Sequence, residues 1–337
     1  MNARLARQLA RLAPMPAGFF GIAVGMLALA GAWRVAAKLW QVPAGAATLA
    51  TVAALAVWVV VMALYALKWV AHRDAARDEW RHEVQSSFVA LGPVSTMLAA
   101  QALNAWSHEL GLALFAAGTV AQLAVGVALH GRLWQGARNA ELVTPAIYLP
   151  TVAAGFVSAT SAAAFGFPQL AALFFGAGVL SWLAIESKLL NRAALGAPLA
   201  PALRPTLGVQ LAPPVVGGVA WMAITGTGFP PVGSGAASLI GYALLGYGLY
   251  QALLLARLLP WIRSQSFTPS YWAFSFGTAA LPTLAMLIAQ RGGAPAWMHE
   301  LAFALFLASN AVFAVLIVKT LALLVEGRLL PLKAAAH

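Results

Sequence analysis

Tyr271-Trp272-Ala273-Phe274-Ser275-Phe276-Gly277 is an aromatic cluster that enters the ninth of ten apolar segments in this chain. With about 3.6 residues per turn, one helical stripe holds Trp272, Phe276, Ala279, Thr283 and Gln290, and Phe274 projects to the opposite side. If the helix begins near residue 267, Phe276 lies roughly 13 Å into a hydrocarbon layer about 30 Å thick. A gate would sit at that depth, and packing against lipid or a neighbouring helix is the alternative.

The composition around this cluster is that of a membrane protein. The 337 residues are 62% hydrophobic and 9% charged, far outside the range of a soluble globular domain. Ten segments are long enough to cross a bilayer as helices. We expect an all-α polytopic protein forming one transmembrane channel domain over residues 1–337, with spans at approximately 16–37, 46–70, 86–105, 111–129, 144–166, 169–189, 204–225, 234–259, 267–290 and 296–324.

The basic residues predict the orientation of these spans. Of the 20 Lys and Arg residues, 17 lie at the termini and in the even-numbered connections, and the other side keeps only Arg34, Lys38 and Arg291. Cytoplasmic segments carry such an excess, so both termini are expected in the cytoplasm. We expect an integral protein of a bacterial-type inner or plasma membrane, with an uncleaved first span. The net charge of +11 then needs no nucleic-acid partner, and it favours anionic membrane lipids.

Prolines reveal a repeat. Pro16, Pro93, Pro150, Pro214 and Pro282 fall in the odd-numbered segments and recur every 57 to 77 residues, about the length of one helical hairpin. The interiors of the even-numbered segments contain no proline. A proline in a transmembrane helix frees a carbonyl group that neighbouring helices, hydroxyls or water must satisfy. We therefore expect five hairpins in a quasi-five-fold ring, with the odd helices around a central pore and the even helices outside.

Simple geometry gives the size of that pore. Five helices spaced about 10 Å apart have axes about 8.5 Å from the centre, which leaves an opening about 3–4 Å in radius. One inward phenylalanine would fill it, so Phe276 becomes the candidate gate. The odd helices also supply the candidate pore-lining residues Pro93, Thr96, Pro150, Ser158, Pro214 and Thr283.

Several motifs, in order along nearly the whole chain, resemble those of the tellurite-resistance/dicarboxylate transporter family, which includes bacterial TehA and the slow-type anion channels of plant guard cells. The matching segments are 16–21, 33–34, 132–136, 148–152, 174–178, 211–214 and 272–277. The resemblance implies a homotrimer whose protomers each have a pore lined by the odd helices. It also implies occlusion by Phe276, with Gly21 beside the path. Guard-cell relatives place proline directly after this phenylalanine, whereas Pro282 comes later here, so the local kink is expected to differ.

The sequence argues against an enzyme. The six histidines lie in connections, at span ends or at the terminus, in no metal-ligand spacing, and the chain has no cysteine, so we expect no metal site and no cofactor. Arg34 and Glu186 are the two charges closest to the membrane interior. We expect each of them to pair with its own neighbouring groups in a structural role. Our leading hypothesis is a gated channel for small monovalent anions such as chloride or nitrate. The alternative is a proton-linked carrier or exporter of C4-dicarboxylate, sulfite or tellurite oxyanions.

Overall fold

The computed structural model describes residues 14–136, 138–229, 233–291 and 293–330. Within these ranges every regular element is helical, and ten helical spans are long and apolar enough to cross a membrane. The all-α polytopic prediction is therefore confirmed. The spans run over Ala17–Trp40, Gly45–Ala71, Gln85–Leu103, His108–Trp134, Pro145–Ala164, Pro168–Leu195, Pro201–Gly226, Gly235–Ile262, Pro269–Ala289 and Ala296–Val325.

Each span begins and ends within about six residues of its predicted position. The largest differences are at the ends of the fourth and sixth spans, which continue through polar residues to Trp134 and Leu195. A helix keeps its own backbone hydrogen bonds when it leaves the hydrocarbon layer, so it need not end where the apolar run ends.

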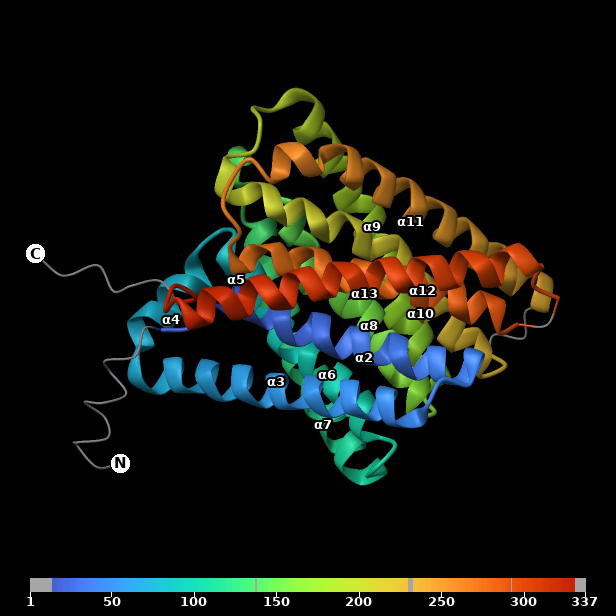
Figure 1. Ribbon diagram of the computed structural model, residues 1–337. Coiled ribbons are helices and arrows are strands. Elements are labelled where there is room, and N and C mark those ends of the chain that lie inside the picture. Colours follow the sequence, from blue (N-terminus) through green and yellow to red (C-terminus); the bar gives the residue numbers. More distant parts are fainter. Residues whose placement is uncertain (1–13, 137, 230–232, 292, 331–337) are drawn as a thin grey trace, which may run out of the picture.

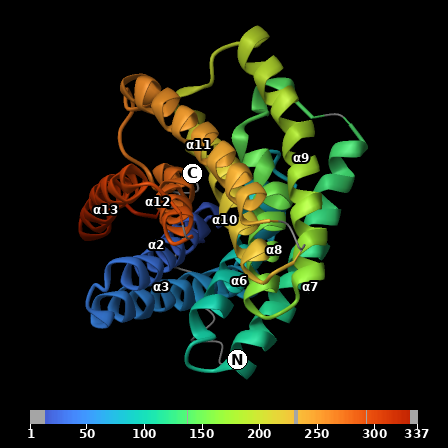
Figure 2. The ribbon, with the colours of Figure 1, turned by 90° about the vertical axis from the view of Figure 1, so that its right-hand side faces the viewer.

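The odd-numbered spans form a closed ring. Their main helices are α2 (Phe20–Trp40), α6 (Leu91–Leu103), α8 (Ala154–Ala164), α10 (Ala212–Gly226) and α12 (Ser275–Ala289). Each packs against the next in this order, and α12 packs against α2. The even-numbered spans each pack against the odd helix that precedes them and lie at the periphery (Figures 1 and 2). They are α3 (Ala44–Ala71), α7 (His108–Trp134), α9 (Pro168–Leu195), α11 (Ser234–Ile262) and α13 (Ala296–Val325).

Burial separates the two sets of helices. In an apolar stretch of 18 residues taken from each span, 61% to 83% of the residues are buried in the odd spans, against 22% to 28% in the even spans. The even helices thus present most of their apolar surface outward, where lipid can cover it. The prediction of five hairpins with the odd helices inside is confirmed.

Every odd span starts with a short segment before its main helix. These segments are η1 (Ala17–Phe19), α5 (Gln85–Val89), η3 (Pro145–Tyr148) with the π-helix η4 (Leu149–Ala153), η5 (Pro201–Leu211) and η6 (Pro269–Phe274). The breaks lie at the end of the ring where the odd spans begin, which we call the inner end; the opposite end is the outer end. An outer helix compensates for the π-helix, since Gln122 Nε2 of α7 donates to the carbonyl oxygen of Pro150 at 2.6 Å.

Two helices joined to the inner end complete the fold. The amphipathic α4 (Arg73–Arg81) connects the second and third spans, and η2 (Ala140–Leu142) precedes the fifth span. Glu79 of α4 is buried, forms an ion pair with Lys68 at 2.8 Å and accepts a hydrogen bond from the backbone N–H of Ala17 at 2.7 Å. This carboxylate therefore ties α4 to the start of the first span.

Candidate anion pathway

Two cavities lie along the inside of the ring. The inner cavity has a volume of about 370 Å³ and is walled by the segments that begin the odd spans, with Gly21, Val24 and Ala212 at its deep end. The outer cavity has a volume of about 680 Å³ and is walled mainly by α2, α6, α10 and α12, with contributions from the start of α3 and the connection after α6. The ring thus encloses one vestibule at each end.

Phe276 lies between these two cavities. Among the described residues it alone lines both. It is the second residue of α12, immediately after the change from the 3₁₀-helix η6 to an α-helix. Its side chain is half-buried, as expected for a ring with open space on both sides.

The stripe of α12 that faces the outer cavity differs in part from the predicted one. Thr283 lines this cavity as expected, but its neighbours on the stripe are Ala280 and Leu287. Ala279 is fully buried and lines neither cavity. All of these residues lie in the α-helix α12, where Ala280, Thr283 and Leu287 follow Phe276 within a narrow stripe and Ala279 lies at its side; the 3₁₀-helix before Ser275 changes only the phase of Trp272.

Two of the three other aromatic residues of the cluster, Trp272 and Phe274, are held by neighbouring elements. Trp272 forms part of the wall of the inner cavity, but its indole Nε1 donates to Thr320 Oγ1 of α13 at 2.8 Å. Phe274 packs against Gly208 of η5, where an added Cβ would lie 2.6 Å from its ring, and it lines neither cavity. Phe274 is thus a packing residue, as predicted.

Close contact between α2 and α12 sets the position of Phe276. A Cβ on Gly25 would lie 2.3 Å from Ser275 Oγ, so only glycine allows the helices to approach this closely. Ser275 Oγ donates to the carbonyl oxygen of Trp272 at 2.6 Å and lies 3.3 Å from that of Gly21. The residue directly before Phe276 is therefore fixed from two sides.

The other predicted lining residues lie in different places. Gly21 lines the inner cavity. Ser158 is buried with its hydroxyl 3.4 Å from Met97 Sδ, and Thr96 Oγ1 donates to the carbonyl oxygen of Gly92 at 3.0 Å. The structure places five of the predicted residues behind the walls of the two cavities, namely Pro93, Thr96, Pro150, Ser158 and Pro214.

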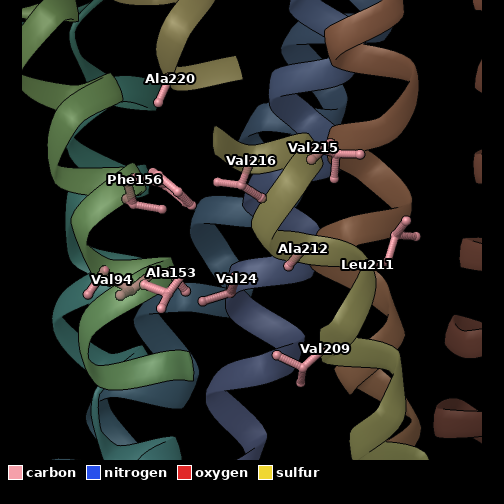
Figure 3. Close-up of a cluster of buried hydrophobic side chains, with 14 of the residues drawn as sticks. Val24, Val94, Ala153, Phe156, Val209, Leu211, Ala212, Val215, Val216 and Ala220 are labelled. Carbon is pink, nitrogen blue, oxygen red and sulfur yellow. The ribbon is translucent and has the colours of Figure 1, made fainter. Parts of the chain in front are cut away.

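Aliphatic residues that the sequence analysis did not single out form much of the narrow region. Figure 3 shows Val24 of α2 together with Val209, Ala212 and Val216 of the seventh span. Three of the four line the inner cavity, and Val216 lines the outer one. The spacing of three and four residues along the seventh span was a possible signal, but the same spacing occurs on every buried helical face.

The charges that line the cavities are positive. Arg34 and Lys38 line the outer cavity, and Arg328 lines the inner one. Arg34 Nη1 donates to Thr51 Oγ1 of α3 at 3.3 Å, which holds the guanidinium at the cavity wall. Among the described residues, no Asp, Glu or His lines either cavity. Arg328 Nη1 forms an ion pair with Glu326 at 2.8 Å, so an anion is favoured over a cation mainly at the outer end.

Glu186 is satisfied by neutral groups. Its carboxylate accepts hydrogen bonds from Tyr148, from Trp182 Nε1 at 3.0 Å, from Gln210 Nε2 at 2.9 Å and from Tyr247 at 3.3 Å. Glu186 therefore has the expected structural role, with neutral donors as its partners. Trp182 belongs to α9 itself, and the other three donors join α9 to the fifth, seventh and eighth spans. Within the part of the chain that the structure describes, no three His, Asp or Glu residues come together in a way that could hold a metal ion.

Comparison with known proteins agrees with this architecture. The family model described as SLAC1, voltage-dependent anion channel, matches residues 14–321. The tellurite resistance protein TehA homolog of Haemophilus influenzae is 33% identical over 316 residues, which cover 94% of this chain and 92% of the relative.

Two plant proteins are also similar. The S-type anion channel SLAH1 of Arabidopsis thaliana is 25% identical over 278 residues, covering 79% of this chain and 70% of the relative. The S-type anion channel SLAH4 of the same plant is 26% identical over 220 residues, covering 64% and 60%. The chain thus belongs to the SLAC1 family of membrane anion channels and transporters, to which the TehA-like tellurite-resistance proteins are related.

Proposed function

We propose that this protein is a gated channel for small monovalent anions such as chloride or nitrate, with the path inside its own ring of helices and Phe276 as the closed gate. The observation that carries the proposal is the position of Phe276, the one described residue that lines both cavities. An aromatic ring at an apolar neck blocks ions by filling the space and by excluding water.

The charge distribution supports selection for anions. Arg34 and Lys38 raise the local anion concentration at the outer end, whereas at the inner end the charge of Arg328 is offset by Glu326. The hydroxyl groups of Thr206, Ser275 and Thr283 along the walls donate to backbone carbonyl groups of their own spans, so they add no strong anion-binding donors. Arg34 and Lys38 attract an anion without providing a tight, fully charged binding pocket, which favours passage over capture.

The lining disfavours the carrier alternative. A proton-coupled carrier of dicarboxylates needs a titratable group that exchanges protons along the transport path. Among the described residues, no acidic side chain and no histidine lines either cavity. Glu186 is held by four neutral donors outside both cavities.

The orientation and assembly belong to the same proposal. We place the inner end in the cytoplasm because the described Lys and Arg residues gather there, at the inner ends of the helices and in the connections that join them. The predicted contributions of Arg4, Arg7, Arg11 and Lys333 lie outside the described residues. A bacterial-type inner or plasma membrane and a homotrimeric assembly follow from the family resemblance, with membrane lipids around the even helices.

Reversal potentials in planar bilayers test the channel directly. The purified protein is reconstituted, and current is recorded under a chloride gradient at equal pH and then under a pH gradient at equal chloride. A channel gives a reversal potential that follows the chloride gradient and ignores the pH gradient. A reversal potential that moves with pH would reject the channel in favour of the proton-linked carrier.

A further inference from the structure

A third cavity lies outside the ring, at the inner end between the third, fourth and fifth spans. Its volume is about 150 Å³, several times the space that one water molecule needs. Its wall combines basic and hydroxyl side chains with an aliphatic rim. The polar and charged lining residues are Arg81, Glu83, Ser86, Ser87, His130, Arg132 and Arg138.

Two serines in this wall are buried with unused hydroxyl groups. Ser86 is 7% exposed and Ser87 is 4% exposed, and both line the cavity. Neither hydroxyl has a hydrogen-bond partner among the described residues. Both hydroxyl groups are therefore free to donate into the cavity, and a ligand that accepts hydrogen bonds from both would be stabilised here.

The arginines add charge and further unused donors. Nε of Arg138 is buried without a hydrogen-bond partner, and it lies 3.8 Å from Glu83 Oε2. Arg132 is oriented by Trp80, whose carbonyl oxygen accepts from Nη2 at 2.8 Å and whose ring lies 5.6 Å from the guanidinium carbon. With Arg81 the cavity holds three guanidinium groups against the single carboxylate of Glu83, a net charge of +2 with the histidine neutral.

Burial shows that Glu83 only partly offsets the cost of the Arg138 charge. It lowers the pKa of Arg138 below its usual value; Glu83 opposes the shift and Arg132 adds to it. The carboxylate of Glu83 is shared, because Oε2 also accepts a hydrogen bond from the backbone N–H of Asn139 at 2.9 Å. An oxygen anion with several acceptor oxygens, such as a phosphate group, would complete this arrangement of hydroxyls and guanidinium groups.

The location identifies the source of such an anion. The exposed Trp134, at the end of the fourth span, lies one residue after Leu133 in the cavity rim. Tryptophan concentrates at the headgroup level of membranes, so the cavity opens at that depth. Leu129 and Leu133 then offer an apolar surface next to the charged groups, as acyl chains below a headgroup require.

We propose that this cavity binds the phosphate group of an anionic phospholipid, with Ser86, Ser87 and Arg138 as its direct donors. Arg81 and Arg132 supply the surrounding positive charge. The site is separate from the proposed anion path and does not depend on it.

Native mass spectrometry of the delipidated full-length chain tests the site. Phosphatidylglycerol, diacylglycerol and inorganic phosphate are titrated separately into the wild type, Arg138→Gln and the double variant Ser86→Ala with Ser87→Ala. The double variant should keep the wild-type melting temperature without lipid, because its hydroxyls have no partner in the described chain. Arg257→Gln is the matched control, since Arg257 is exposed near the inner end of the eighth span and outside the cavity.

We expect phosphatidylglycerol to bind the wild type and Arg257→Gln alike, and to bind the other two variants at least about tenfold more weakly, since hydrogen bonds to a charged group are lost. Equal binding by all four proteins would overturn the site. Equal retention of diacylglycerol and phosphatidylglycerol would show that the phosphate is not recognised. Binding of inorganic phosphate without binding of phosphatidylglycerol would overturn the assignment to a lipid.

Discussion

Replacing Phe276 with alanine should open the anion path. The five-helix geometry leaves an opening about 3–4 Å in radius, which one phenyl ring fills. Removing this ring joins the inner cavity of about 370 Å³ to the outer cavity of about 680 Å³. The closed gate thus becomes a continuous passage.

The size of the effect follows from the barrier that the ring imposes. Moving an ion into a dry, apolar constriction costs several kcal/mol, and each 1.4 kcal/mol removed from a barrier raises the rate about tenfold. Val24 and Val216 keep the neck apolar after the substitution, so part of the barrier stays. We expect Phe276→Ala to raise chloride conductance at least about tenfold in bilayers under symmetrical chloride.

Phe274→Ala is the matched control. Its ring packs on Gly208, so truncation should leave a packing defect that costs about 3 kcal/mol of stability, without an increase in conductance. Phe276 faces open space on both sides, so its truncation should cost less. Wild-type conductance from a correctly assembled Phe276→Ala protein, or an open pore in Phe274→Ala, would refute the gate assignment.

Three further predictions concern orientation, lining and charge. Gly293→Cys should react with an impermeant thiol reagent from outside the cell and Ser264→Cys should not; the reverse labelling would invert the topology. Thr283→Cys, in the outer cavity, should make the current sensitive to small thiol reagents, whereas Leu180→Cys, 70% exposed on α9, should not; equal sensitivity would argue against a path inside the ring. Arg34→Gln should lower chloride current at low ionic strength and less so at high salt, and a current that is unchanged in both conditions would contradict steering by the outer cavity.

The ninth span shows what helical periodicity can and cannot predict about the direction of side chains. The opposite roles of Phe276 and Phe274 were predictable, because two residues on a helix differ by roughly 200°. The stripe beyond Phe276 was predicted only in part, since Thr283 faces the outer cavity but Ala279 does not. The gate itself stays a prediction until conductance is measured.

For the residues that line the cavities, the sequence predicted the right helices and mostly the wrong side chains. Prolines and hydroxyls marked the odd helices correctly, but Pro93, Thr96 and Ser158 lie behind the cavity walls. The hydroxyl of Thr96 bonds to its own helix, as hydroxyls in apolar surroundings commonly do. Proline and hydroxyl content therefore identifies which helices are inside, and it does not identify which face of each helix is turned to the axis.

The sequence by itself determined the ten spans, the predicted orientation and the division into inner and outer helices. Hydropathy, charge and proline spacing can be read from each segment by itself. Their energetic effect in a membrane does not depend on which helices are the neighbours, so they could be used without the tertiary structure. Only the tertiary structure decided which side chains meet at the axis and which meet Glu186 or the third cavity. Those contacts depend on where each odd span changes from a 3₁₀-, π- or short helix to its main α-helix. They also depend on close packing, such as that of Gly25 against Ser275. In both cases a small rotation of a helix turns a different residue toward its neighbour.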